Sequence, residues 1–401
     1  MINGKSIYLD HSATTPVDHE VLKAMLPYFS KIYGNPSSLH SFGQAASAAV
    51  NRAREQAAKF LNCAGGEIIF TSGATEADNL AIFGLVGALL EKSPNEKLHI
   101  ITSAVEHPAV MEPFNKLAAR GVRVTYLPVD KNCAVDLETF KRAIKADTVL
   151  VSLMYVNSEI GAIQPIREMG KIIEKINERR AKQGGKKRIY FHTDAVQALN
   201  FLNCDVKHLH VDLLSLSGHK IYGPKGVGAL YAKQGTPLRS VQLGGHHEKN
   251  FRSGTLNVPG IVGLGQALKL CSKNKEANNK KICKLRDEFV ARLKRQIPKI
   301  IVNTDLRNST PSHANISFVG AEGESILIAL DLEDIAVSTG SACASASLKA
   351  SPVLLAMGVK EEVAHSTIRF TLGKNNTAEE MRRVVKILPP IVKRLRAMAP
   401  K

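Results

Sequence analysis

Lys220 lies where an apolar stretch of the sequence ends in polar residues, and its amine could act as a nucleophile. The stretch begins at Val211 and leads into Ser217, His219 and Lys220, and a Gly-Pro turn follows. Burial at the end of a strand favours the neutral, nucleophilic form of a lysine. Ser217 and His219 would add donors suited to a phosphate. An exposed lysine beside a turn explains these residues equally well when they are taken alone.

Two further segments could bind other parts of a phosphorylated ligand. Residues 72–76, Ser-Gly-Ala-Thr-Glu, follow an expected strand and open an expected helix, where backbone N–H groups and a hydroxyl could bind one phosphate. Asp194 follows another apolar strand, at the sheet edge where α/β proteins bind ligands. Either feature alone is also explained as a helix cap. Neither GxGxxG nor GxxxxGK[ST] occurs in the sequence, so dinucleotide and P-loop nucleotide binding lose their best support.

The combination of these three features predicts a site for pyridoxal phosphate. Lys220 would form the Schiff base, Asp194 would hold the pyridinium N–H, and the helix start at residues 74–75 would bind the phosphate. The conjunction is far less expected by chance than any one of its parts.

Cys343 and Arg369 are candidates for work on a substrate. Cys343 lies in residues 338–347, Ser-Thr-Gly-Ser-Ala-Cys-Ala-Ser-Ala-Ser, whose small side chains predict a mobile surface loop with an exposed thiol. Such a thiol could reach a cofactor and then deliver its product elsewhere, although an idle thiol is the simpler alternative. Arg369 lies in an expected strand and could bind a carboxylate through two hydrogen bonds, or form half of an ion pair.

The elements that must position these residues alternate between short β-branched runs and longer runs of helical period. The expected strands are residues 67–71, 98–103, 123–128, 148–154, 188–192, 213–217 and 228–231, and the expected helices are residues 44–60, 76–90, 107–119, 137–143 and 166–180. This alternation predicts an α/β domain with a mostly parallel sheet covered on both faces.

The C-terminal part predicts a smaller α+β domain. A long charged helix over residues 259–296 would lead into strands near Ile300, at 314–318 and at 366–372, and a last helix would begin at Thr377. The pattern Thr377-x-x-Glu380 is a capping box. We therefore expect a large domain over residues 15–260, and a small domain formed by residues 1–14 and 261–401.

The composition describes a globular protein that lies outside membranes. The chain has 401 residues, and its six cysteines show no CxxC spacing. It has neither an apolar run long enough to span a bilayer nor a signal-like N-terminus, so we expect a cytoplasmic protein. The net charge is +18, but only 5% of the residues are aromatic, which favours solvated basic helix faces over a nucleic-acid site.

Nine motifs carry a resemblance to a known family. They are LDHSATTP, YGNPSS, FTSGATEADN, SAVEHPAV, HTDAVQ, SGHKIYGPKGVGALY, RSGTLN, STGSACASAS and HSTIRFTLG. Spread nearly end to end, they resemble the cysteine desulfurases, pyridoxal-phosphate enzymes of fold type I within the class V aminotransferases. Within them, the chain is similar to the iron–sulfur cluster assembly type with a long cysteine loop.

The resemblance implies a role for each matching residue around the cofactor. Lys220 matches the Schiff-base lysine, Asp194 the pyridinium partner, His107 the imidazole that stacks on the ring and shuttles protons, and Gln197 the donor to the phenolic oxygen. The implied phosphate ligands are Ala74, Thr75, Ser217, His219 and, from the neighbouring subunit of a homodimer, Thr255.

The resemblance also implies the reaction. L-cysteine would become L-alanine, with Arg369 binding its carboxylate and Cys343 accepting its sulfur as a persulfide. The persulfide sulfur would pass to an iron–sulfur cluster scaffold or another acceptor. Whether Cys343 also ligates a cluster transiently stays open.

Two positions depart from the family pattern. The family reads Asn-Asn where this chain has Asn157 and Ser158. The resemblance implies that Asn157 binds the substrate and that position 158 contacts cofactor and substrate. The shorter Ser158 predicts a weaker hold on the substrate carboxylate, or a bridging water. His246 stands where the family usually has a glycine, so the loop must differ locally if that position has a positive φ.

Other functions remain compatible with parts of this pattern. A selenocysteine lyase or an aminotransferase would also use Lys220 and Asp194, but an aminotransferase has no need of Cys343. A non-catalytic basic binding protein on a decayed enzyme fold would have lost some of the residues between His107 and Arg369. Loss of turnover in a Cys343→Ser variant would favour sulfur chemistry over amino transfer.

Overall fold

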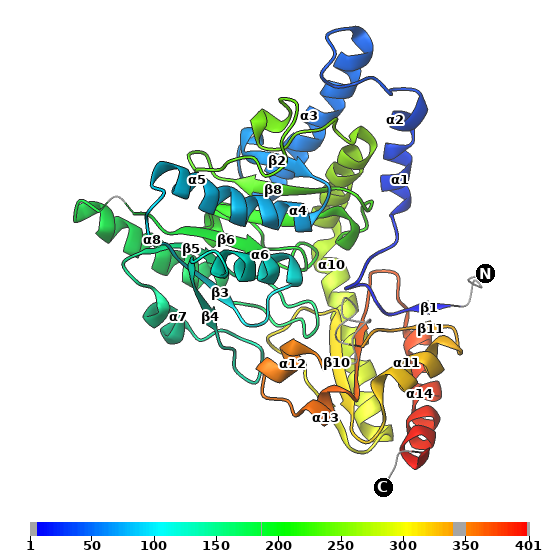
Figure 1. The fold of residues 1–401 in the computed structure, drawn as a ribbon. Helices are drawn as coiled ribbons and strands as arrows, with labels where there is room; N and C mark the ends of the chain where they lie inside the picture. Colours follow the sequence, from blue (N-terminus) through cyan, green and yellow to red (C-terminus); the bar gives the residue numbers. More distant parts are fainter. Residues whose placement is uncertain (1–5, 186, 340–349, 399–401) are drawn as a thin grey trace.

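A seven-stranded sheet forms the centre of the larger part of the molecule (Figure 1). The computed structural model describes residues 6–185, 187–339 and 350–398, so Cys343 and all but the first two residues of its predicted loop (residues 338–347) lie outside the described residues. The strands, in their order across the sheet, are β2 (Ile68–Thr71), β8 (Gly228–Ala232), β7 (Leu213–Ser217), β6 (Tyr190–Asp194), β5 (Thr148–Ser152), β3 (His99–Ser103) and β4 (Arg123–Leu127). Strand β8 runs antiparallel to both neighbours, and the other pairs are parallel. The predicted mostly parallel sheet is confirmed.

Alternate residues of the strands point to opposite faces of this sheet, and each face has its own helices. Ile69 and Ile100 contribute to a cluster under one set of helices, whereas Phe70 and Ile101 contribute to the cluster on the other face. The first set is α4 (Ala74–Asn79), α5 (Leu85–Lys92) and α6 (Pro108–Ala118), and the second includes α3 (Ser41–Leu61), α7 (Leu137–Ala143), α8 (Ile166–Lys182), α9 (Val206–Leu209) and the first half of α10 (Val258–Gln296).

Helix α10 connects the large sheet to a second, smaller body of structure (Figure 1). Its N-terminal half packs in the core of the large sheet through Ile261 and Leu264, and its C-terminal half packs in a separate core through Phe289 and Leu293. The elements around that second core are β1 (Ile7–Tyr8), β9 (Ile300–Val302), β10 (His313–Phe318), α11 (Gly323–Asp331), β11 (Ile335–Ala336), β12 (Thr367–Thr371) and α14 (Ala378–Met398). A three-stranded antiparallel sheet in the order β12-β10-β9 lies against α10, while β1 pairs with β11.

Several helices and one helix interruption were not predicted. They are α1 (His19–Met25), α2 (Pro27–Ser30), α9 (Val206–Leu209), α11 (Gly323–Asp331), α12 (Pro352–Ala356), α13 (Glu361–Ala364) and a π-helical turn (Leu80–Gly84) between α4 and α5. The predicted capping box is present, since Thr377 N–H donates to Glu380 Oε2 over 2.9 Å and Glu380 N–H donates to Thr377 Oγ1 over 3.2 Å. No helix within the described ranges is long and apolar enough to cross a membrane.

Candidate active site

Three of the predicted site residues meet at the carboxyl ends of neighbouring strands. Asp194 is the last residue of β6, Lys220 ends the short 3-10 turn that follows β7, and His107 precedes α6 after β3. Asp194 is buried, and Lys220 and His107 are half-buried. Parallel strands bring their carboxyl ends to one edge of a sheet, which is where open α/β sheets bind ligands.

The Lys220 amine lies against the N-terminal segment of the chain. Its Nζ donates to the carbonyl of Ser12 over 2.5 Å and to that of Ala13 over 2.7 Å. The backbone just after the lysine adopts an uncommon conformation, because Tyr222 has φ 63° and its N–H donates to Thr15 Oγ1. These contacts fix the position of the amine, and sequence reasoning assigned no role to Ser12 or Ala13.

Two other buried acids, Asp78 and Glu106, lie near the Asp194 carboxylate. Burial raises the pKa of Asp194, while the N–H of Val196 and the nearby His107 and Lys220 oppose that rise. Burial also raises the pKa of Glu106 to about 8, and it raises the pKa of Asp78 well above the usual range. Burial therefore favours the neutral form of both neighbours, whereas the nearby Lys220 amine favours the anionic form of Asp194.

Glu106 is held by buried polar partners, whereas neither carboxyl oxygen of Asp78 makes a hydrogen bond within the described residues. Glu106 accepts hydrogen bonds from Ser103 Oγ over 2.6 Å and from the N–H of Met154 over 3.0 Å. Asp78 is fully buried, and its Oδ1 lies 3.5 Å from Nε2 of His192, which is also fully buried. Burial lowers the pKa of His192 to about 3, so this imidazole stays neutral.

His107 is held as the residue preceding α6. Its Nδ1 accepts a hydrogen bond from the N–H of Ala109 over 3.1 Å. Burial lowers the pKa of His107, Asp194 opposes this, and Lys220 adds to it. The ring is therefore neutral near pH 7, and because Nδ1 acts as an acceptor, its proton lies on Nε2.

The predicted phosphate ligands come from the start of α4, the end of β7, the turn after β7 and an exposed loop. Ala74 and Thr75 lie in its first turn, where backbone N–H groups have no partner within the helix, and the Thr75 side chain is exposed. Ser217 ends β7, and His219 follows it with Nδ1 placed 3.2 Å from Thr14 Oγ1. Thr255 is exposed.

The predicted substrate side of the site is joined to the smaller body through Arg369 of β12. Its Nη1 donates to the carbonyl of Ser158 over 3.3 Å, and its Nη2 lies 2.8 Å from Asp10 Oδ1. Gln197 contacts the chain two residues after Asp10, with Nε2 donating to the carbonyl of Ser12 over 2.9 Å. Arg369, Ser158 and Gln197 are therefore linked through residues 10–12.

The Asn157 side chain bonds to Val105, Glu159 and Ile160 rather than to Arg369, Gln197 or residues 10–12. It is buried, its Oδ1 accepts from the N–H groups of Glu159 and Ile160, and its Nδ2 donates to the carbonyl of Val105. Its amide thus stabilises the turn that presents Ser158. A direct contact between Asn157 and a substrate stays a prediction.

His246 does not adopt the strained conformation that its glycine-like position could have required. The positive φ angles of this loop fall at Gly244 and at residues 248–250. His246 Nδ1 instead lies 2.7 Å from Asn250 Oδ1.

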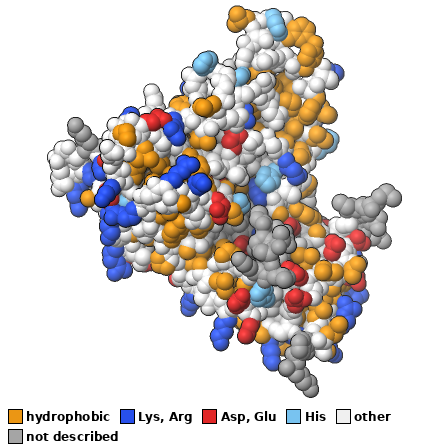
Figure 2. Space-filling model, in the orientation of Figure 1, with side chains coloured by type: hydrophobic (Ala, Val, Ile, Leu, Met, Phe, Trp, Pro, Cys, Tyr) orange, Lys and Arg blue, Asp and Glu red, His pale blue; other side chains and the backbone are white. Residues whose placement is uncertain are grey.

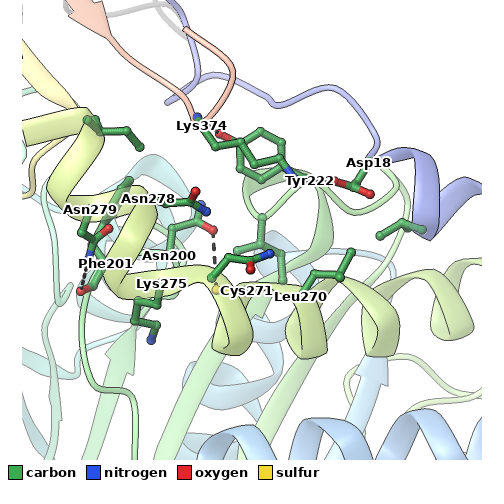
Figure 3. Close-up of a pocket in the computed structure, with 14 residues that line it drawn as sticks. Asp18, Asn200, Phe201, Tyr222, Leu270, Cys271, Lys275, Asn278, Asn279 and Lys374 are labelled. Atoms are coloured by element: carbon green, nitrogen blue, oxygen red, sulfur yellow. Dashed lines mark hydrogen bonds and ion pairs between the residues drawn. The ribbon is translucent and has the colours of Figure 1, made fainter. Parts of the chain in front are cut away.

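A separate small cavity lies beside Ile221 and Tyr222, the two residues that follow Lys220 (Figure 3). It has a volume of about 30 Å³ and lies between α10 and the loops that carry Tyr222 and Lys374. Lys374 is ion-paired with Asp18, and its Nζ lies 4.3 Å from the centre of the Tyr222 ring. The cavity can hold water but is too small for an organic cofactor.

The donor set around Lys220 fits pyridoxal phosphate. Lys220 supplies a primary amine, and the Asp194 oxygen not bonded to Val196 is the acceptor that a ring N–H requires. The first turn of α4 supplies N–H groups suited to one phosphate.

Comparison with protein families agrees with this fold and donor set. The family model described as aminotransferase class-V matches residues 7–384. The chain therefore belongs to the class-V aminotransferase family.

Curated relatives narrow the resemblance within this family. The chain is 46% identical to "Cysteine desulfurase IscS" of Clostridium botulinum (strain Hall), over 99% of this chain and 96% of the relative. It is 44% identical to "Cysteine desulfurase" of Homo sapiens, over 99% of this chain and 84% of the relative.

Solved structures show the same similarity. A structure titled "NIFS-LIKE PROTEIN" superimposes with a TM-score of 0.88 at 36% identity, covering 97% of this chain and all of that one. Another, titled "SspA in complex with cysteine", superimposes with a TM-score of 0.78 at 34% identity, covering 93% of this chain and all of that one. Fold type I, expected from the sequence, is confirmed.

Proposed function

We propose that the protein is a cysteine desulfurase, a sulfurtransferase that uses pyridoxal phosphate to convert L-cysteine into L-alanine. The Cβ–Sγ bond of the substrate breaks, its sulfur bonds to the thiol sulfur of Cys343, and a proton replaces the sulfur on Cβ. One cysteine and one protein thiol thus give one alanine and one persulfide. The observation that carries this proposal is the meeting of an amine, a buried carboxylate and a guanidinium around Lys220, Asp194 and Arg369.

The residues around Lys220 would hold the cofactor at three points. Lys220 would bind its aldehyde carbon, Asp194 its ring nitrogen, and the first turn of α4 its phosphate, with Ser217 and His219 as further donors. When bound, pyridoxal phosphate supplies the electron sink that weakens bonds at Cα and Cβ of an amino acid. Gln197 would donate to the phenolic oxygen, beside Ser12.

Proton movement near the amino acid falls to His107 and Lys220. The neutral His107 carries its proton on Nε2, so it is suited to donate there and to stabilise a developing negative charge. The Lys220 amine, in its free form, would be placed to take the Cα proton as a base. Arg369 would bind the substrate carboxylate, beside the Ser158 carbonyl.

The thiols in the described part of the chain are poor candidates for the sulfur acceptor. Burial raises the pKa of Cys63 and Cys204 to about 12 and that of Cys271 to about 11. It also raises the pKa of Cys133 and Cys283. The thiolate is the reactive form, and burial disfavours it at each of these five cysteines. This supports the assignment of the persulfide to Cys343.

We also propose that the active unit is a homodimer. Six large apolar side chains are exposed on and around α1 to α3, and Figure 2 shows hydrophobic side chains gathered at this end of the molecule. They are Leu22, Leu26, Phe29, Tyr33, Leu39 and Phe42. A second copy of the chain would cover such a surface, and the exposed Thr255 would contact the phosphate in the partner's site. The final sulfur acceptor would be an iron–sulfur cluster scaffold or a similar protein.

Product analysis tests the proposed function directly. Purified protein supplied with pyridoxal phosphate, L-cysteine and a reductant should release alanine and sulfide in equal amounts. If cofactor-loaded protein forms no alanine, the proposal is wrong, and a selenocysteine lyase or an aminotransferase becomes the better reading.

A Ser158→Asn variant should bind L-cysteine more tightly than the wild type. The longer amide restores the donor that the family has here, so we expect KM to fall by a factor of about 2–10, the value of one hydrogen bond, with little change in kcat. Steady-state kinetics measure this, with the remote, exposed Ser93→Asn as the matched control. An unchanged KM in the Ser158→Asn variant would contradict a role for position 158 in holding the substrate.

A further inference from the structure

The N-terminal motif LDHSATTP, residues 9–16, crosses the candidate site although the reaction assigns it no role. Residues 7–8 form β1, which pairs with β11, and Asp10 then bridges to Thr371 at the end of β12. From there the chain passes over the lysine turn to reach α1. We call residues 10–15 the N-terminal strap.

The strap contacts five of the residues predicted to act in the reaction, namely Lys220, Gln197, His219, Ser158 and Arg369. Ser12 Oγ donates to the carbonyl of Ser158 over 2.6 Å, and the backbone carbonyls of Ser12 and Ala13 accept from Lys220. Thr15 N–H donates to the carbonyl of His219 over 2.9 Å. One short segment therefore ties the cofactor side of the site to its substrate side.

The strap begins with an ion pair on the predicted carboxylate ligand. Asp10 Oδ1 lies 2.8 Å from Nη2 of Arg369, whose side chain is only 4% exposed. Within the described residues, Nε of Arg369 is buried without a hydrogen-bond partner, and Nη1 makes one long bond to the Ser158 carbonyl. A buried guanidinium needs an anion, and Asp10 supplies it on one side while leaving donors for a ligand.

We infer that Asp10 is a positioning residue for the substrate carboxylate, acting by fixing the plane of the Arg369 guanidinium. Bidentate binding of a carboxylate requires that this plane be held before the substrate arrives. The strap keeps Asp10 in register with Lys220 through Ser12 and Ala13. This inference rests on the proposed function, because it concerns how L-cysteine is oriented toward the lysine.

The test compares a substrate that has a carboxylate with one that lacks it. In cofactor-loaded Asp10→Asn protein we expect KM for L-cysteine to rise about tenfold or more, while kcat stays within about threefold. Cysteamine, which is cysteine without the carboxylate, should bind with unchanged affinity, as followed by the absorbance of the bound cofactor. Asp18→Asn is the matched control, because Asp18 lies three residues after the strap and pairs with Lys374 instead of Arg369.

Two further variants separate positioning from simple structural support. Asp10→Glu keeps the charge and should restore KM at least in part. In an Arg369→Ala background, Asp10→Asn should add no further loss of L-cysteine affinity.

Three results would overturn the inference. The first is an unchanged KM for L-cysteine in the Asp10→Asn variant. The second is a lower KM, which would mean that Asp10 competes with the substrate for Arg369. The third is an equal loss of cysteamine and L-cysteine affinity, which would mean general damage to the site. A wild-type protein that forms no alanine would instead refute the proposed function itself.

Discussion

Replacing Lys220 with alanine is expected to reduce desulfuration of L-cysteine by a factor on the order of 10³ or more. The variant removes the amine that would bind the cofactor and take the Cα proton, and no other lysine is held against Ser12 and Ala13 in the described structure. Borohydride reduction followed by mass spectrometry should show a pyridoxyl adduct on the wild-type chain and none on the variant. Alanine release measures the loss of activity.

Lys225→Ala is the control for this experiment. Lys225 lies only five residues further on, in the Gly-Pro turn, but it is exposed. An exposed surface lysine can be removed with little effect, so activity within about twofold of the wild type is expected. If Lys220→Ala retained wild-type turnover, or if the adduct formed at another lysine, the assignment of Lys220 as the nucleophile would be wrong.

The strands that position Lys220 and Asp194 were predictable because their signal is local. A short apolar run between helical stretches placed β7 at residues 213–217, where the structure has it. The prediction ended the Asp194 strand at residue 192, whereas β6 continues to Asp194. The last residues join the strand because Thr193 and Asp194 pair with Leu214 and Ser215, and such pairing has no signature in composition.

The substrate side of the site could not be predicted from local pattern. The contact between Asp10 and Arg369 joins residues 359 positions apart, and the Ser12 contact with Ser158 spans 146. The polar, turn-rich sequence around Ser12 gives no periodicity from which its course across the site could be read. That course is fixed by long-range contacts, which begin with the pairing of β1 with β11 and of Asp10 with Thr371.

The burial of Asp78 and Glu106 near Asp194 was also not predicted, for a different reason. Asp78 lies within an amphipathic helical pattern, in which a lone carboxylate is usually placed on the solvent side. The structure instead turns Asp78 toward His192, inside the molecule. Because Asp78 and His192 are buried together, burial favours the neutral form of both side chains. That conclusion requires their distance and burial as well as their residue types.

Replacing Cys343 with serine is expected to lower alanine formation from L-cysteine by a factor on the order of 10³ or more, while the cofactor stays bound. A serine hydroxyl is not ionised near pH 7 and cannot accept sulfur as a thiolate does. Incubation with ³⁵S-labelled L-cysteine without reductant should leave reducible label on the wild-type chain and none on the variant. Alanine measured in the same samples shows whether both products fail together.

Cys283→Ser is the matched control, because Cys283 is half-exposed but its thiol pKa is raised by burial. It should label and turn over as the wild type does. None of the five cysteines in the described residues has the thiolate character needed to replace Cys343, so rescue from within the chain is not expected. If Cys343→Ser released alanine and sulfide at the wild-type rate, sulfur would leave the substrate without a protein thiol. The persulfide part of the proposal would then be wrong, whereas the cofactor chemistry at Lys220 would stand.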